Sequence, residues 1–327
     1  MSVGPFALHG LTLAFVWFLA TNVATAIVVA AVATRLTNRQ QAGVPALWLG
    51  LRLLPAVTSL AFVAAIFLPS YWKYEPRDFV EGFDPTLAAL AIAGLAVCGA
   101  STVRGLLAWR RASRRARAWL RASRPLDLPH TSMPAYQIDA DAPMMALVGV
   151  LRPRLFITRG VLAALTDEEL RASVAHEIGH WRAADNLKRL AMRAAPDVLA
   201  AVGMARAIER RWASAAEHVA DGRACDTADA RERARARCAL ASALVKVARL
   251  SPAVTPLAEP ISTLVDGGDL ASRVRSLLDD GTPAVARPRV RGRWIGVGVA
   301  VAALAFGYAP LLRVVHLATE ILVHTLP

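Results

Sequence analysis

The sequence has few charged residues, few cysteines and almost no lysine. Charged residues make up 19% of the 327 positions against 55% in the hydrophobic set, and the mean hydropathy is +0.40. The three cysteines are too few for a disulfide scaffold, and none has C-x-x-C spacing. Only 3 of the 38 basic residues are lysines, so the net charge of +13 is an arginine excess. This composition excludes a disordered chain and a disulfide-stapled secreted protein, and it indicates a membrane protein with one polar domain.

Four segments are long and apolar enough to cross a bilayer, which requires roughly 20 helical residues. They are residues 6–32, 53–72, 85–103 and 294–312. A cleaved signal peptide is the alternative for the first segment, with Ala24-Thr25-Ala26 as the cleavage site. That segment has no basic region before it, and its apolar run continues past the alanines, so we expect a membrane helix.

The loop charges predict the orientation of these spans. Arg35 and Arg39, with Arg52 just beyond them, lie between spans one and two. Seven arginines follow span three between residues 110 and 124, and four precede span four between 287 and 293, whereas the loop 73–84 is net acidic. Because basic loops stay inside, we expect both termini outside the cell and residues 110–293 in the cytoplasm.

This pattern predicts a mainly helical, multi-pass protein of the cell membrane. Its parts are three membrane helices in residues 1–109, a cytoplasmic domain in 110–293, and a fourth span with a short outer tail in 294–327. A nucleic-acid footprint is the rival interpretation of the arginines. The densest of them lie directly at the ends of spans three and four, where topology and anionic lipid already account for them, so we expect the lipid bilayer as a partner and no nucleic acid.

The cytoplasmic segment combines short strands with helices. We expect strands at 136–138, 146–148 and 155–158, and an edge strand around Ala146–Val148 would suit the addition of an extended substrate. A helix begins after Thr166, which forms a capping box with Glu169. Further helices continue to about Leu250 with a break at Pro196, and a Pro-rich connector leads to a last amphipathic helix over 270–278.

The capped helix contains His176-Glu177-Ile178-Gly179-His180. Histidines four residues apart lie on one helical face, so both imidazoles can bind a single ion. Glu177 lies at the edge of that face, where its carboxylate can act as a general base toward an attacking water. Two surface histidines on an amphipathic helix are the alternative interpretation of this motif.

A catalytic zinc ion needs a third protein ligand, and a second acidic motif can supply it. Glu217-His218-Val219-Ala220-Asp221 follows in a later helical stretch. We expect Glu217 to be the third ligand, with His218 as the competing choice about 100° away on that helix. Asp221, on the same face, can accept the free imidazole N–H of a ligand histidine, and Asp185 is a further candidate for that role. A solvated acidic helix face is the alternative for these carboxylates.

These motifs together resemble the BlaR/MecR-type integral-membrane metallopeptidases, which are relatives of the HtpX and CAAX-protease group. The resemblance is carried by residues 152–160, 165–170, 176–180 with Asp185-Asn186, and 217–221. It implies an α+β, zincin-like metalloprotease domain in which His176, His180 and Glu217 bind Zn²⁺ and Glu177 is the general base. The 271–277 stretch also resembles a late family segment that brings an arginine to the site, and either Arg273 or Arg275 could be that arginine.

The resemblance also implies a protein substrate, which could be a BlaI/MecI-like transcriptional repressor, a membrane protein or the enzyme itself. The antibiotic-sensing members carry a penicillin-binding sensor after the last span, whereas only 15 residues follow Leu312 here, so we expect no sensing by that route. Two rival functions remain open. One is an HtpX-like quality-control protease, and the other is a signal transducer with a structural zinc site and no proteolytic activity.

Overall fold

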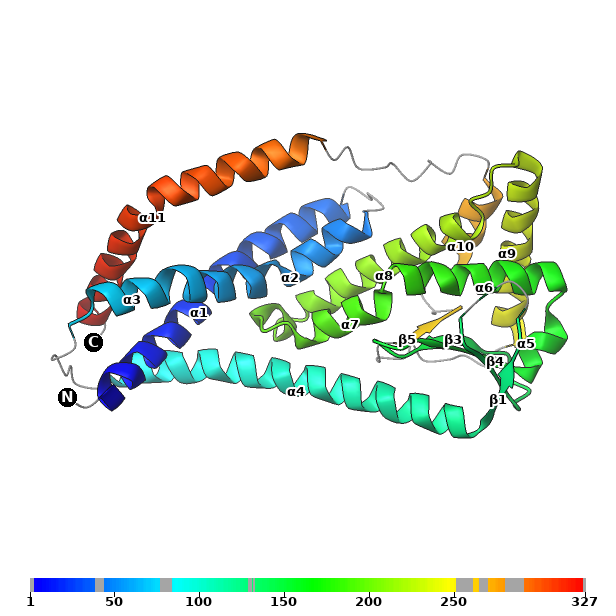
Figure 1. Ribbon diagram of the computed structural model, residues 1–327, viewed down its shortest axis with the longest axis horizontal. Helices are drawn as coiled ribbons and strands as arrows, with labels where there is room; N and C mark the ends of the chain where they lie inside the picture. The colour runs from blue at the N-terminus through cyan, green and yellow to red at the C-terminus, as the bar shows by residue number, and fades with distance from the viewer. Residues whose placement is uncertain are drawn as a thin grey trace.

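The computed structural model describes residues 3–38, 44–76, 84–128, 131, 133–250, 261–264, 270–279 and 291–325. In the described part the protein is mainly helical with one small mixed sheet, and it is elongated, with long helices at one end and the sheet at the other (Figure 1). The helical elements are α1 (Val3–Asn38), α2 (Pro45–Phe62), η1 (Val63–Phe67), α3 (Leu68–Tyr74), α4 (Pro85–Arg121), α5 (Arg159–Ala164), α6 (Asp167–Arg182), α7 (Asp185–Ala194), η2 (Val198–Ala200), α8 (Met204–Ala224), α9 (Ala230–Leu250), α10 (Leu270–Leu278) and α11 (Arg291–Thr325). The strands are β1 (Ser123–Leu126), β2 (Ala135–Ile138), β3 (Met145–Val148), β4 (Arg154–Thr158) and β5 (Ile261–Thr263).

In the part of the chain that the structure describes, three helical stretches are long and apolar enough to cross a membrane. They cover Gly4–Thr37, Pro45–Tyr74 and Pro85–Arg121, and the second combines α2, η1 and α3. The three spans predicted before residue 110 are thereby confirmed as apolar helices, although each helix is longer than its apolar run. The predicted fourth span lies inside α11, and its membrane crossing stays a prediction.

The second span begins eight residues earlier than predicted, and this changes the position of Arg52. The sequence placed Arg52 just before the span, as one of the basic residues that set the orientation. The structure instead places it inside α2, where it is 1% exposed and paired with Asp197. Buried ionic pairing explains the difference, because a paired charge can remain within an apolar helix.

The sheet has the order β1-β2-β4-β3-β5, with β2 and β4 parallel and the other neighbours antiparallel. The strands β2, β3 and β4 match the three predicted ones. The sequence did not predict β1 or β5, and the expectation that β3 is an edge strand is wrong. Residues Ala146 to Val148 pair with β5, because a segment more than 100 residues later in the chain returns to cover that edge.

Alternating side chains of the sheet face two different layers. Leu147, Leu155 and Ile157 belong to the main core, which they share with residues of α6 and α9. Ala146, Val148 and Phe156 face the other side, where the end of α4 packs against them through Trp119 and its neighbours. This alternation follows from the two-residue period of a strand. The helix α4 therefore continues from the membrane region to the underside of the sheet (Figure 1).

The helix α6 begins as the sequence predicts. The side chain of Thr166 accepts a hydrogen bond from the backbone N–H of Glu169, and the Glu169 carboxylate accepts one from the N–H of Thr166. This capping box satisfies two N–H groups that an α-helix leaves unpaired at its start. The helix α7 ends at Ala194, just before the predicted break at Pro196, and α10 has the predicted bounds.

Candidate metal centre

The two histidines of the H-E-x-x-H motif lie one turn apart on the buried face of α6. Their side chains are 0% and 1% exposed. The Nε2 atoms of His176 and His180 are 3.1 Å apart. Two nitrogens bound to one tetrahedral zinc ion lie about 3.3 Å apart, given Zn–N bonds of roughly 2.0–2.1 Å. The helix therefore presents the pair at the spacing that a single ion needs.

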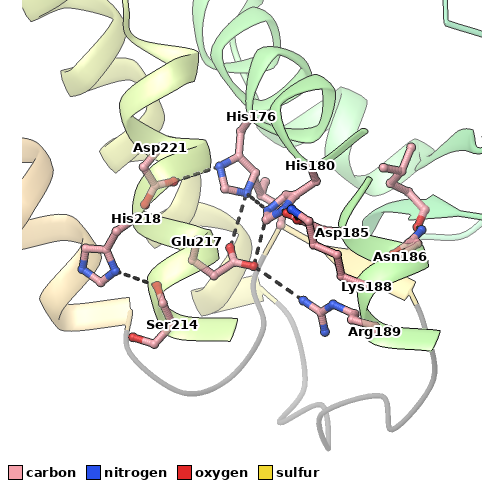
Figure 2. A network of polar contacts seen from close by, with 12 residues as sticks. His176, His180, Asp185, Asn186, Lys188, Arg189, Ser214, Glu217, His218 and Asp221 are labelled. Carbon is pink, nitrogen blue, oxygen red and sulfur yellow. Dashed lines mark hydrogen bonds and ion pairs between the residues drawn. The ribbon is translucent and has the colours of Figure 1, made fainter. Parts of the chain in front are cut away.

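The helix α8 packs beside α6 and brings Glu217 to the same point (Figure 2). One carboxylate oxygen of Glu217 is 3.4 Å from Nε2 of His176, and the other is 3.4 Å from Nε2 of His180. The ligand atoms of these three buried residues all lie within 4.8 Å of one another. The structure thus brings together the three residues that the sequence predicted as ligands.

A second ring of carboxylates holds the imidazoles from behind. Oδ1 of Asp221 is 2.9 Å from Nδ1 of His176, and Oδ2 of Asp185 is 2.8 Å from Nδ1 of His180. The Nδ1–H of His180 donates to Asp185, and Asp221 lies close to Nδ1 of His176, so the Nε2 atoms of both rings face the site. Both predicted outer carboxylates occupy the predicted positions.

A zinc ion fits the centre. Two Nε2 lone pairs at 3.1 Å repel each other unless a proton or a metal ion lies between them. Burial alone lowers the pKa of His180, but the charge of Glu217 and the contact with Asp185 outweigh it and raise that pKa to about 10. The positive charges of His180 and Arg273 hold the pKa of Glu217 well below its usual range despite its burial. The site therefore attracts positive charge, and two imidazoles with one carboxylate form a typical catalytic zinc donor set.

Glu177 lies next to these ligands without joining them. It is fully buried, and neither carboxylate oxygen has a hydrogen-bond partner among the residues that the structure describes. Burial raises the pKa of Glu177, partly offset by the neighbouring histidines. An ionisable group held this way is poised to take up and release a proton.

Arg273 of α10 also reaches the centre, which settles the choice that the sequence left between Arg273 and Arg275. Its guanidinium donates to both oxygens of Asp221, at 2.7 and 2.8 Å, and lies 3.0 Å from Glu217. Arg275 is exposed on the opposite side of α10. The contacts of Arg273 and His176 lower the pKa of Asp221 to about 2 against the effect of burial, so this carboxylate stays ionised.

Two more side chains near the centre have positions that only the structure reveals. His218, the competing third ligand, is turned away, with its ring nitrogens 2.8 Å from the carbonyl of Ser214 and 3.2 Å from Ser272. Arg189, which the sequence did not single out, lies 3.9 Å from Glu217 and over the ring of Trp212. No sequence motif marks Arg189, because its role depends on how α7 packs beside α8.

A second group with metal-binding side chains lies at the other end of the molecule. Glu75, His316 and Glu320 are half-buried, with ligand atoms within 4.8 Å of one another. His316 is 3.8 Å from Glu75, and Glu320 is 3.7 Å from His324. Ion pairing among these residues accounts for the cluster without an ion.

One comparison with known proteins, the match to a family model, agrees with this geometry. A search of the curated proteins found no match to the chain. Residues 110–264 match the family model of Peptidase family M48, a segment that contains the H-E-x-x-H helix, its third ligand and all five strands of the sheet. Together with the buried His176, His180 and Glu217 triad, this match shows that residues 110–264 form a zinc metallopeptidase domain of Peptidase family M48 in a chain with membrane helices.

Proposed function

We propose that the protein is a membrane-bound zinc endopeptidase that cleaves a cytoplasmic or membrane protein in regulatory signalling, for example by inactivating a transcriptional repressor. The observation that carries the catalytic part is the buried carboxylate of Glu177, which has no hydrogen-bond partner among the described residues and lies beside the metal ligands. A structural zinc site has no use for such a group, so a catalytic role is favoured over a purely structural one.

The chemistry follows from the positions of the side chains. A bound zinc ion supplies Lewis acidity, which makes an attacking water acidic and polarises the peptide carbonyl. Glu177 takes one proton from the water as its oxygen attacks the carbonyl carbon. Glu177 then delivers this proton to the amide nitrogen as the C–N bond breaks, so that an amine is released together with a carboxylic acid, which keeps the second proton of the water. Asp221 and Asp185 keep the two imidazoles in the orientation that this site needs.

The substitution Glu177→Gln tests this role, because it keeps the shape of the side chain and removes the base. We expect full-length Glu177→Gln protein to bind zinc and to lose about 10²- to 10⁴-fold in peptidase activity. Glu168→Gln is the matched control, since Glu168 is an exposed residue of the same helix. The measurement compares cleavage products, by their new N-termini, in membranes that contain each variant. Full turnover and full signalling by Glu177→Gln would identify a transducer with a structural zinc site.

The regulatory role rests on the resemblance to the BlaR/MecR-type proteins. An HtpX-like quality-control protease would share the same centre and differ in its substrates. The N-terminal survey separates the two functions, because a regulator yields one or a few cleaved proteins and a quality-control enzyme yields many. β5 covers β3 in this structure, so an extended substrate that adds beside β3 must first displace the chain's own segment.

We further propose that the metallopeptidase domain spans residues 110–293 and faces the cytoplasm, with four membrane helices and both termini outside. The basic stretches on one side of the spans support this orientation. A reporter inserted after residue 84 should read as outside, and one inserted after residue 125 as inside. The opposite readout would place the metal centre outside the cell and exclude cytoplasmic substrates.

A further inference from the structure

One arginine connects a membrane helix to the helix that carries the third metal ligand. Arg52 lies in α2 and is 1% exposed. Its guanidinium forms an ion pair with Asp197, lies 3.0 Å from Glu209 and donates to the carbonyl of Met192 at 2.6 Å. All three partners belong to the segment from α7 to α8, more than 100 residues later in the chain.

The pairing explains how this arginine can be buried. A charged side chain inside an apolar helix is costly and is retained where it is paired. Arg52 and Arg193, which is 3.6 Å from Glu209, balance the two carboxylates of Asp197 and Glu209. Asp197 is itself 2% exposed and caps η2 through the backbone N–H of Ala200. The connection between α7 and α8 therefore depends on a cation that a membrane helix supplies.

The membrane helix α1 holds the same turn with a second polar side chain. Asn22 is 0% exposed. Its Nδ2 donates to the carbonyl of Pro196 at 2.9 Å, and its Oδ1 accepts from the N–H of Val198 at 3.0 Å. The turn that joins α7 to α8 is thus held by side chains of two membrane helices, α1 and α2.

These contacts extend along α8 toward the metal centre. Glu209 and Glu217 are eight residues apart in one helix, which is about 12 Å along its axis. Ile208, Trp212 and Ala216 lie in the core cluster that contains Ala26 and Val29 of α1 and Trp48 and Leu51 of α2. α8 is therefore packed against the membrane helices along the two turns that precede its metal ligand.

We propose that Arg52 is a positioning residue for the metal centre. It fixes α8 to α2, so that Glu217 keeps its place between His176 and His180. The membrane helices then help to hold a metal ligand in place, in addition to anchoring the domain. A displacement of α2 against α6 changes the metal affinity, which gives the membrane region a direct route to the active site.

The test measures the zinc affinity of full-length protein by competition with a chelator, which requires no substrate. Arg52→Lys keeps the charge but cannot make all three contacts at once. We expect its zinc affinity to fall about tenfold, as for other groups that orient metal ligands. Ser70→Ala is the matched control. It removes another buried hydrogen bond between helices, from Ser70 to the carbonyl of Leu312, at a site away from α8.

A second variant covers the case in which Arg52→Lys does not fold. The double substitution Arg52→Gln and Asp197→Asn removes both charges together, so no unpaired charge stays buried. We expect it to unfold cooperatively, like Ser70→Ala, and to bind zinc about tenfold more weakly. If each folded variant binds zinc within twofold of the wild type, Arg52 has only a structural role. Because the assay reads metal binding alone, this outcome leaves the proposed peptidase function untouched.

Discussion

Replacing Asp221 with asparagine should weaken zinc binding through a residue that does not touch the metal. Oδ1 of Asp221 lies 2.9 Å from Nδ1 of His176, and the carboxylate accepts two hydrogen bonds from Arg273 at 2.7 and 2.8 Å. Asparagine keeps one acceptor oxygen, so it can serve His176 or one arm of Arg273 but not all of these contacts. It also removes the negative charge that makes the imidazole a better donor to the metal.

The contacts give the size of the effect. A hydrogen bond to a charged group contributes about 1.5–3 kcal/mol, and tenfold in affinity corresponds to about 1.4 kcal/mol. The loss of the His176 contact alone therefore predicts a roughly 10- to 100-fold lower zinc affinity, the range found for groups that orient metal ligands. Among the described residues, Arg273 then keeps Glu217, 3.0 Å away, as its ion-pair partner in the centre. Because Arg273 would then compete with the metal for this ligand, the loss of affinity becomes larger. The pKa of Asp221 is held to about 2, so the expected effect is the same across neutral pH.

Chelator competition on full-length protein at neutral pH measures this affinity. Asp226→Asn is the control, because Asp226 is exposed just beyond the end of α8. Asp185→Asn should have a smaller effect, because that carboxylate pairs with the half-exposed Lys188 and leaves no arginine to compete for a metal ligand. Thermal unfolding in the presence of a chelator separates a loss of affinity from a loss of fold. A zinc affinity within twofold of the wild type, in a variant that folds normally, would refute the idea that Asp221 orients His176.

Two further predictions concern stability. Burial raises the pKa of Glu169, but the contacts with Lys246 and Ser242 outweigh burial and lower that pKa. The contribution of this carboxylate to the free energy of unfolding is therefore complete above the unfolded pKa of about 4.3, and it is lost as the pH falls through the lower folded pKa. Glu169→Gln should therefore cost about 1–2 kcal/mol at pH 7 and less at pH 3, as measured by chemical unfolding, and an equal cost at both pH values would contradict the pairing. In α4, Gly94→Ala would place its Cβ 2.5 Å from the carbonyl oxygen of Phe15, so we expect a loss of about 1–3 kcal/mol in thermal unfolding. Gly99→Ala meets nothing within 4 Å in the same helix and should be neutral or slightly stabilising, and equal effects of the two changes would contradict the close packing of α1 and α4.

The sequence by itself determined the features that depend on neighbouring residues. His176 and His180 share a helical face because they are four residues apart, and Thr166 with Glu169 marks the start of their helix. Apolar runs of sufficient length identified the three membrane helices before residue 110. Helical geometry also predicted that Glu217 and Asp221 lie on one face of α8, with His218 about 100° away. Each of these signals lies within one element, so the sequence alone carries it.

Only the tertiary structure decided which distant elements meet. Arg52 is a loop-end charge by its sequence surroundings, and it becomes a buried partner of Asp197 only because the α7–α8 turn packs against α2. β5 covers β3 through a pairing between segments more than 100 residues apart. Arg273 reaches Glu217, and Arg275 does not, because of the way α10 lies against α8. No local pattern specifies such contacts, since they arise from burying several apolar faces at once, and charged residues at those faces are retained where the packing supplies a partner.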